Sequence, residues 1–517
     1  MGTPLPADLM DRTTAAALEE KKKLQKHFKR FDILFFMICT LVGLDTLGAV
    51  ASNGAQAFTW LIFLGVLYFV PYAMLMSELG GAFPEEGGPY VWTRLAFGRL
   101  VGALTAILYW VSNPIWVGGT LTITAIATFS DFFFKLSTVG EYVFALAFIW
   151  FTIIMAILSF QVGKWIPTIG AWVRMVVLSF FSLSMLMYAI KHGVHGFGLH
   201  AFFPTYAIFI AAVPVLFFNY EGFELPSAAG EEMTNPQRDV PFAILRSGIG
   251  TVLMYGVPIL LILLVLPTGQ VSSLGGFIDA AKIVFTVWGG HVAADGTATL
   301  TGFGNAMGHV AAVAFILALI SSGTTWIIGA DRTQAVAGYD GAGPRVLGRF
   351  SRRFGTPIVV NLMSGVTSTI FMVLAFQLTS GNAAKYFAVV LGLVISTTTI
   401  SYLAIFPALI KLRYSHPHVE RPYQVPGGMV GIWIAGVLTT FWALLATVAL
   451  LWPGFLTSDP NASLPSGFTR SQYELSQLVP LLILFALGVV FYWAGGKTRG
   501  QMVEIPLAEQ MGVGAVS

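Results

Sequence analysis

Three carboxylates within long apolar runs are the residues of this sequence best placed to do chemistry. Asp45 lies within residues 31–53, and Glu221 and Glu224 lie near the end of the run 206–226. A charged side chain at the centre of a membrane-spanning helix costs roughly 2.5 to 3.5 kcal/mol on insertion scales, so such residues usually face a cavity or a pathway. The sequence therefore predicts that the three acids line a solute path.

Glycine and proline residues beside these acids weaken both helices. Gly43 and Gly48 bracket Asp45, while Gly222 lies between the two glutamates and Pro226 follows them. An interrupted helix at membrane depth is tolerated only where it lines a cavity or is buried in protein. Two such helices in corresponding positions of a chain are typical of a substrate site between structural repeats.

The composition requires a lipid environment for these helices. The 517 residues are 56% hydrophobic and only 10% charged, whereas soluble domains carry about 25% charged residues. The net charge of +3 argues against nucleic-acid binding. With Cys39 as the one cysteine, neither an intramolecular disulfide nor a cysteine metal cluster can form. No nucleophile–base pattern or cofactor loop is recognisable, so we expect no enzyme activity, cofactor or metal.

Apolar windows of about 20 residues or more predict an all-α integral membrane protein with twelve transmembrane helices. The windows are 31–53, 58–82, 98–130, 140–160, 165–190, 206–226, 241–266, 310–337, 357–378, 384–411, 429–452 and 477–495. On the side that holds both ends of the chain we count 23 Lys and Arg, against 5 on the other. The positive-inside rule therefore places both termini in the cytosol. We expect the bundle to lie in the plasma (inner) membrane.

The interruptions also predict the domain organisation. The first and sixth spans are five apart, which fits a core of two five-helix repeats with inverted topology. The predicted parts are a cytosolic tail (1–30), the repeat core (31–411), two further helices (412–496) and a second cytosolic tail (497–517). We expect the first tail to be a solvated charged segment that orients the first span.

The outer segment at 267–309 is long for a loop and contains an apolar stretch that predicts a short amphipathic helix. Long loops with structure of their own are often gates or lids. A passive outer cap is the alternative.

Four motifs in the order of the chain resemble those of the amino acid–polyamine–organocation transporter superfamily. They are residues 78–90 (ELGGAFPEEGGPY), 222–241 (GFELPSAAGEEMTNPQRDVP), 326–332 (WIIGADR) and 421–428 (RPYQVPGG). The greatest similarity is to the branch of glutamate:GABA exchangers and polyamine or basic amino-acid permeases. The resemblance implies a permease with a 5+5 inverted repeat that moves amino acids or polyamines by alternating access, coupled to protons or to a counter-substrate.

The resemblance also assigns residues to the predicted site. Asn113 matches a substrate-facing Asn of agmatine exchangers, Phe218 falls where those exchangers place a Trp gate, and Trp326 matches their helix 8 Trp. Glu224 matches the Glu of their G-x-E motif, whereas Glu221 stands where relatives often have an apolar residue. The predicted substrate-binding residues are Gly43, Asp45, Asn113, Phe218, Glu221 and Trp326. The predicted coupling or gating residues are Asp45, Arg174 and Glu224.

Structural alternatives exist for most of these residues. Asp45 could cap the second half of its helix, and Glu224 could bond neighbouring backbone. Trp326 could be core packing, and Asn113 could join helices without touching solute.

Arg174 lies one turn from Val177, the position that matches a Lys replacing sodium in many proton-coupled relatives. Arg174 either supplies a fixed charge there or extends to the inner headgroups. Because Arg does not titrate, proton coupling would have to use one of the three acids.

Other classes of function stay open at this stage. A sodium-coupled symporter of similar fold would need oxygens from helices 1 and 8, which Thr324 and Thr325 could partly supply. A sensor would bind amino acids without moving them, and a channel would conduct without saturation. The exact substrate, the direction, the coupling and a possible homodimer are not determined by the sequence.

Overall fold

The computed structural model describes residues 6–24, 26–158, 165–194, 199–267, 271, 276–378, 383–461, 464–465 and 467–511. The ends of the two predicted tails, at 1–5 and 512–517, and parts of the outer segment lie outside this range. Within it, ten helices are long and apolar enough to cross a membrane. They correspond to ten of the twelve predicted spans.

Two of these ten combine several helical pieces. The first consists of α4 (Gly54–Leu64), η2 (Gly65–Phe69) and α5 (Val70–Ala82), and the second of α7 (Arg99–Trp116), η3 (Val117–Leu121) and α8 (Thr122–Phe132). The other eight are α9 (Thr138–Ile157), α11 (Trp165–His192), α13 (Pro236–Val265), α15 (Gly302–Tyr339), α16 (Ile358–Leu378), α17 (Ala383–Ser415), α18 (Gly428–Leu451) and α19 (Arg470–Ala494).

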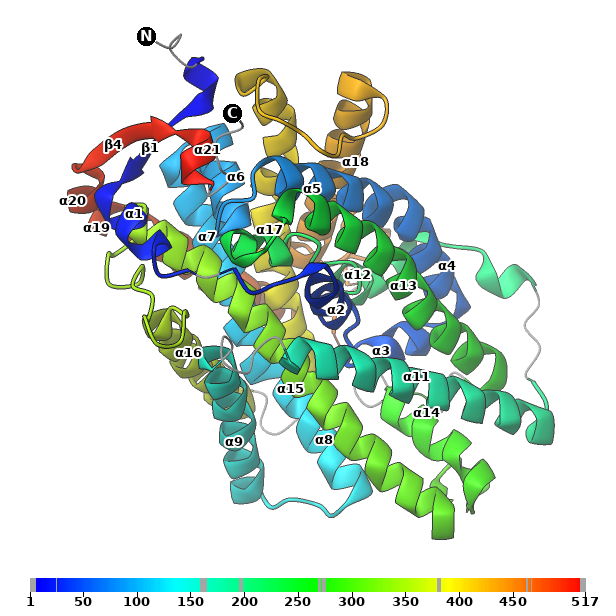
Figure 1. Cartoon of the computed structure of the whole chain (residues 1–517). Coiled ribbons are helices and arrows are strands. Elements are labelled where there is room, and N and C mark those ends of the chain that lie inside the picture. The colour runs from blue at the N-terminus through cyan, green and yellow to red at the C-terminus, as the bar shows by residue number, and fades with distance from the viewer. Residues whose placement is uncertain are drawn as a thin grey trace.

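The predicted interruptions of the first and sixth spans are confirmed. The first span consists of α2 (Arg30–Leu41) and α3 (Leu47–Ser52), with non-helical backbone between them. In the sixth, α12 (Tyr206–Phe218) ends in a turn before the 3-10 helix η5 (Leu225–Glu232). Figure 1 shows α2, α3 and α12 in the middle of the bundle, where α13 and α11 pack against α2. The broken helices are therefore enclosed by protein, as their exposed backbone groups require.

The N-terminal segment is folded against the bundle, so the expectation of a solvated tail is wrong. Strand β1 (Met10–Thr14) pairs antiparallel with β4 (Met502–Pro506) near the C-terminus. Helix α1 (Ala15–Lys21) follows β1 directly. Figure 1 shows these elements together at one end of the bundle, beside α6 (Gly88–Phe97). The two predicted tails thus form one small unit.

Lys21 explains why this charged segment is not solvated. Its Nζ lies 2.8 Å from Glu85 Oε1 and 2.7 Å from Glu231 Oε1, and it donates to the Gln510 carbonyl at 2.5 Å. Although burial alone would lower the pKa of Lys21, the carboxylates of Glu231 and Glu85 raise it above its usual range. The Lys21 ammonium therefore joins both terminal segments to the bundle.

The outer segment contains the predicted short helix, α14 (Gly276–Phe285), and a hairpin of β2 (Gly290–Val292) and β3 (Ala298–Leu300). Helix α14 packs against α3, and it lies at the opposite end of the bundle from β1 and β4 (Figure 1). A Cβ on Gly48 of α3 would lie 2.5 Å from the Gly276 Cα, so the close approach requires glycine. The role of α14 as a gate or a cap stays a prediction.

Candidate functional site

A tyrosine from α13 forms hydrogen bonds with the backbone at the break in the first span. The Tyr255 hydroxyl accepts a hydrogen bond from the Gly43 N–H at 2.6 Å and donates one to the Gly43 carbonyl at 2.9 Å. Backbone groups released by a broken helix must find such partners when they are buried. The backbone N–H of Gly43, a predicted substrate-binding residue, is therefore occupied by Tyr255 in this conformation.

Asp45 is buried next to this break and is only partly bonded. Its Oδ2 accepts a hydrogen bond from Trp116 Nε1 at 3.1 Å, whereas its Oδ1 has no partner among the described residues. A Cβ on Gly43 would lie 3.0 Å from that Oδ1, so glycine keeps the adjacent space open. A buried acceptor without a partner costs about 1–3 kcal/mol, and more when charged. The oxygen is therefore suited to receive a proton or a donor from a ligand.

Trp116, which bonds Asp45, belongs to a cluster of aromatic side chains. The Trp116 ring lies 5.4 Å from the Phe218 ring and 6.1 Å from the Trp326 ring, measured between centroids. Trp326 is fixed by a hydrogen bond from its Nε1 to the Thr40 carbonyl, 3.1 Å away. The faces of such rings attract cations. Of the predicted substrate-binding residues, the structure thus brings Gly43, Asp45, Phe218 and Trp326 together.

Gly222 permits the close approach of the sixth span to this cluster. Its φ is +122°, and a Cβ there would lie 2.5 Å from Thr40 Cγ2 and 2.9 Å from Trp326 Cζ2. The two breaks are also joined directly, since Thr46 Oγ1 donates to Asn219 Oδ1 at 2.6 Å. Both interrupted helices therefore meet at one place.

Glu224 is fully bonded by tyrosines from three helices. Its carboxylate accepts hydrogen bonds from the hydroxyls of Tyr109 at 2.8 Å, Tyr402 at 3.0 Å and Tyr72. The Tyr72 hydroxyl in turn accepts the N–H of Gly222 at 3.1 Å. Glu224 therefore holds the break of the sixth span to α5, α7 and α17, and is not open to a solute here.

Glu221 is buried like Asp45 and has an unpaired oxygen like Asp45. Only 3% of its surface is exposed, and its Oε1 has no hydrogen-bond partner within the described part of the chain. Its carboxylate is close enough to Glu224 for the two charges to repel. Two of the three predicted acids thus carry an oxygen that can accept a proton or a ligand N–H.

Arg174 is completely buried at the break of the first span, so the alternative that it extends to the headgroups is wrong. Its Nε donates to the Val42 carbonyl at 2.7 Å, and its Nη2 donates to the Ala318 carbonyl at 2.7 Å. Further bonds reach Gly170 O and Ser321 Oγ, both at 2.8 Å, and Ser322 Oγ. Five acceptors thus meet the five N–H donors of the guanidinium.

The α15 hydroxyls that bond Arg174 are not those of Thr324 and Thr325, which the sequence offered as possible sodium ligands. Thr325 Oγ1 bonds the Ser321 carbonyl of its own helix at 2.7 Å, and Thr324 Oγ1 bonds the Thr152 carbonyl at 3.4 Å. Thr325 Oγ1 also lies 3.3 Å from Cys39 Sγ of α2, but Ser321 and Ser322 are the hydroxyls that bond Arg174. No signal in the sequence distinguished these four neighbouring hydroxyls.

Asn113 does not join the cluster around Asp45 by a hydrogen bond. Its Nδ2 donates within its own helix, to the Tyr109 carbonyl at 3.0 Å and to Ser112 Oγ at 3.2 Å. Trp116, one turn further along, makes the contact from this helix. Sequence reasoning missed it, although its spacing from Asn113 places both on one helical face.

Buried ion pairs join three of the recognised motifs at the end of the bundle near β1 and β4. The guanidinium of Arg332 lies 3.2 Å from Glu86 Oε1 and 3.2 Å from Glu232 Oε2. Glu232 lies outside the predicted spans, and burial raises its pKa to about 7, although Arg332 acts to lower it. Burial and the Glu232 charge likewise raise the pKa of Glu86. These contacts close that end of the bundle.

Ten apolar helices around two interrupted helices that present partly unpaired acids define a multi-pass membrane transport protein. The sequence matches the amino acid permease family over residues 28–465, and the chain belongs to that family. It is accordingly a transporter and not an enzyme.

Individual relatives agree with this assignment. The chain is 25% identical over 430 residues to the probable agmatine/putrescine antiporter AguD of Lactococcus lactis, covering 83% of this chain and 87% of that protein. It is 22% identical over 468 residues to the glutamate/gamma-aminobutyrate antiporter of the same organism, covering 88% of each. An uncharacterized transporter of Legionella pneumophila is 28% identical over 456 residues, with 84% and 90% covered.

Solved structures share the fold. Two structures of the manganese transporter of Eremococcus coleocola match with TM-scores of 0.52 and 0.55 at 14% and 13% identity. The matches cover 90% and 91% of this chain, and 95% and 94% of the transporter. At this identity the likeness concerns the fold alone. Within the described residues of this chain, no group of three His, Cys, Asp or Glu is placed to hold a metal ion.

Proposed function

We propose that this protein is a secondary transporter that moves a small cationic amine across the plasma membrane by alternating access. The proposal includes twelve transmembrane helices, an inverted repeat that contains the two interrupted helices, and both termini in the cytosol. The observation that carries it is the unpaired Oδ1 of Asp45 at a helix break, on a carboxylate bonded to Trp116, whose ring packs against Phe218 and Trp326.

The chemistry of the cluster favours a polyamine or a decarboxylated amino acid. An ammonium or guanidinium group can donate to Asp45 Oδ1 while the rings of Phe218 and Trp326 provide cation–π contacts. A substrate carboxylate within about 4 Å of an ionised Asp45 would be repelled by about 4 kcal/mol at an effective dielectric of 20. The similarity to an agmatine/putrescine antiporter supports the same substrate class.

Amino acids are the second candidate class. The similarity to a glutamate/gamma-aminobutyrate antiporter favours it. In that case Asp45 would be protonated when the substrate binds, and would therefore be the proton-coupling group. Glu221, which also has an unpaired oxygen, is the other acid able to carry a coupling proton.

Exchange or proton coupling is favoured over sodium coupling. The oxygens from the first span and α15 that a sodium ion would need are Val42 O, Ala318 O and the Ser321 and Ser322 hydroxyls, and these already bond Arg174. Arg174 thus supplies a fixed positive charge between the two elements.

Binding and flux measurements on the purified protein test the proposal. A ligand that binds the folded state raises its melting temperature, so agmatine, putrescine, arginine, glutamate and gamma-aminobutyrate are compared at matched ionic strength. Proteoliposomes preloaded with each compound that binds should then exchange it for the same compound, radiolabelled, added outside. Binding without exchange would identify a sensor, and the absence of both for all five compounds would refute the proposed substrate classes.

A further inference from the structure

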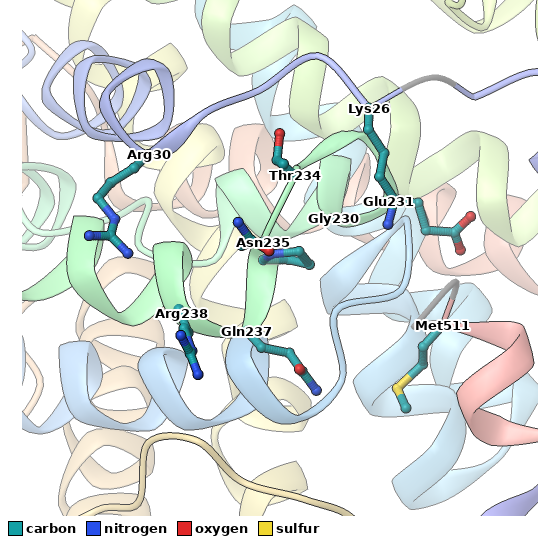
Figure 2. Close-up of a pocket in the computed structure, with 10 residues that line it drawn as sticks. Lys26, Arg30, Gly230, Glu231, Thr234, Asn235, Gln237, Arg238 and Met511 are labelled. Carbon is teal, nitrogen blue, oxygen red and sulfur yellow. The ribbon is translucent and has the colours of Figure 1, made fainter. Parts of the chain in front are cut away.

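A separate polar hollow of about 350 Å³ lies at the end of the bundle that carries the termini, away from the Asp45 cluster. It is bounded by the segment before α2, by the residues that lead into α13, and by the last described residues of the chain (Figure 2). The residues that line it include Lys26, Arg30, Glu231, Asn235, Gln237 and Arg238. This volume lies within the usual range of small-ligand sites.

Cations from two separate parts of the chain line this hollow. Figure 2 shows Lys26 and Arg30 extending from the N-terminal segment toward the start of α13, which carries Arg238. Among the described residues, Arg238 has no ion pair. The neighbouring acids are already paired, since Glu231 lies 2.7 Å from Lys21 Nζ and Asp239 lies 2.7 Å from Arg30 Nε. The hollow therefore has an excess of positive charge.

Uncharged donors complete the lining. The side chain of Asn235 precedes α13 without capping it, so its amide is available to the hollow together with the Gln237 amide, whereas the Thr234 hydroxyl already donates to the Phe28 carbonyl at 3.2 Å. Guanidinium, ammonium and amide N–H groups around one space form a set of donors without an unpaired acid. Phosphate oxygens are the acceptors that such a set recognises best.

We infer that this hollow binds a phosphate-bearing anion, which is either a soluble phosphorylated compound or the headgroup of an anionic phospholipid. Both sources present the same phosphate oxygens to Lys26, Arg30 and Arg238. A lipid source is compatible with the proposed topology. Basic residues beside the cytosolic leaflet attract the headgroups of anionic lipids.

A bound anion would fasten the N-terminal segment to the transport core. The segment already pairs with the end of η5, because the N–H groups of His27 and Phe28 donate to the Glu232 carbonyl at 2.8 and 3.0 Å. The Thr234 N–H returns a bond to the Phe28 carbonyl at 2.9 Å. An anion shared by Lys26 and Arg238 adds a charge-assisted link across the same seam, and so stabilises the closed arrangement of this end of the bundle.

The test uses the full-length protein and two probes. Inorganic pyrophosphate, titrated by calorimetry in a neutral detergent, represents the soluble source. Nanodiscs of phosphatidylcholine with or without phosphatidylglycerol, followed by thermal unfolding, represent the headgroup. The variant Lys26→Ala/Arg238→Ala is compared with Arg246→Ala. Arg246 stacks its guanidinium 3.8 Å from the Phe242 ring centroid, and it is not among the lining residues.

The expected result is that the double variant binds the effective probe at least about tenfold more weakly, a loss of about 1.4 kcal/mol. Arg246→Ala should bind like the wild type, and the stabilisation of each protein is measured from its own melting temperature without anion. Pyrophosphate binding identifies a soluble ligand, and an effect of phosphatidylglycerol alone identifies the headgroup. The inference is overturned if neither probe acts, or if Arg246→Ala loses as much as the double variant.

Discussion

Arg174 donates from its Nε to the carbonyl of Val42, 2.7 Å away, at the residue that directly follows α2, where the first span is interrupted. Its other nitrogens bond α15 through Ala318, Ser321 and Ser322. One permanently charged side chain thus bonds a free carbonyl of the broken helix to a neighbouring helix. A removable ion would make the same contacts only while bound.

This relationship predicts transport that does not depend on sodium. Replacing sodium with choline should leave the initial rate of substrate uptake into proteoliposomes unchanged, because the oxygens that would hold the ion bond Arg174. In Arg174→Ala, these buried acceptors lose their donors at about 1–3 kcal/mol each, so the melting temperature should fall and uptake should be lost. Sodium-dependent uptake by the wild type would contradict the assignment.

Asp45→Asn separates the two possible roles of Asp45. If Asp45 holds the substrate ammonium, the amide removes a charge-assisted hydrogen bond of about 1.5–3 kcal/mol, so affinity should fall about tenfold to more than a hundredfold at every pH. If Asp45 is the proton site, the variant should still bind and exchange substrate but lose pH-dependent accumulation. We expect the first outcome.

The control for this experiment is Asp131→Asn, which neutralises an acid at the C-terminal end of α8. Asp131 is 43% exposed and pairs with Lys282 at 3.6 Å, so its loss should leave transport unchanged. Wild-type uptake and wild-type pH dependence in Asp45→Asn would refute both roles.

Trp326→Leu should weaken binding of a cationic substrate by about 0.5 to 2 kcal/mol, the range for a cation–π contact. Trp326 also donates to the Thr40 carbonyl, so the loss has two causes. Trp326→Phe keeps an aromatic face and removes only the N–H donor. If the phenylalanine variant binds as weakly as the leucine variant, the hydrogen bond and not the ring is responsible.

The helix breaks could be predicted from sequence because their causes are local. Gly43, Asp45, Gly222 and Glu224 lie next to one another along two short stretches. The partners that complete the site are distant: the tyrosines that bond Glu224 are 115 to 178 residues away. An apolar helix with one tyrosine gives no sign of where its hydroxyl points, so these contacts could not be anticipated.

The same limit explains the error over the N-terminal segment. The basic residues near Lys21 resemble a solvated tail, and only the fold brings Glu85 and Glu231 to it. A run of charge does not reveal whether its counter-charges lie in solvent or in protein.

Lys21→Ala should release the N-terminal segment from the bundle. The substitution leaves Glu85 and Glu231 buried without their lysine, and breaking one partner of a buried ion pair costs about 3–5 kcal/mol. Limited proteolysis should cleave the segment near α1 faster than in the wild type. Lys22→Ala, which alters an exposed neighbour, is the control, and equal protection of Lys21→Ala and the control would show that the lysine does not hold the segment.

The closed form of the end of the bundle that carries Arg332 should become less stable, relative to an open form, as the pH rises. Glu232 is buried there among Arg332, Glu86 and Glu231, and its pKa is raised from its ordinary value of 4.5 to about 7. A conformation that opens this end to water would return the pKa toward 4.5. The closed form therefore binds protons more tightly, and its stabilisation is fully present below pH 4.5 and is lost as the pH rises through about 7.

Cysteine labelling measures this closure. Cys39 is the one native cysteine and is buried, so Cys39→Ser with Ser227→Cys gives a single probe in η5, at a position that is 1% exposed in the closed form. Maleimide labelling from the cytosolic side, corrected for the reactivity of a free thiol, should increase between pH 5 and about 8. Adding Glu232→Gln, which mimics the protonated acid, should abolish most of this increase in labelling with pH. Labelling that falls with rising pH, or a Glu232→Gln profile like that of the parent, would show that Glu232 does not control this end of the bundle.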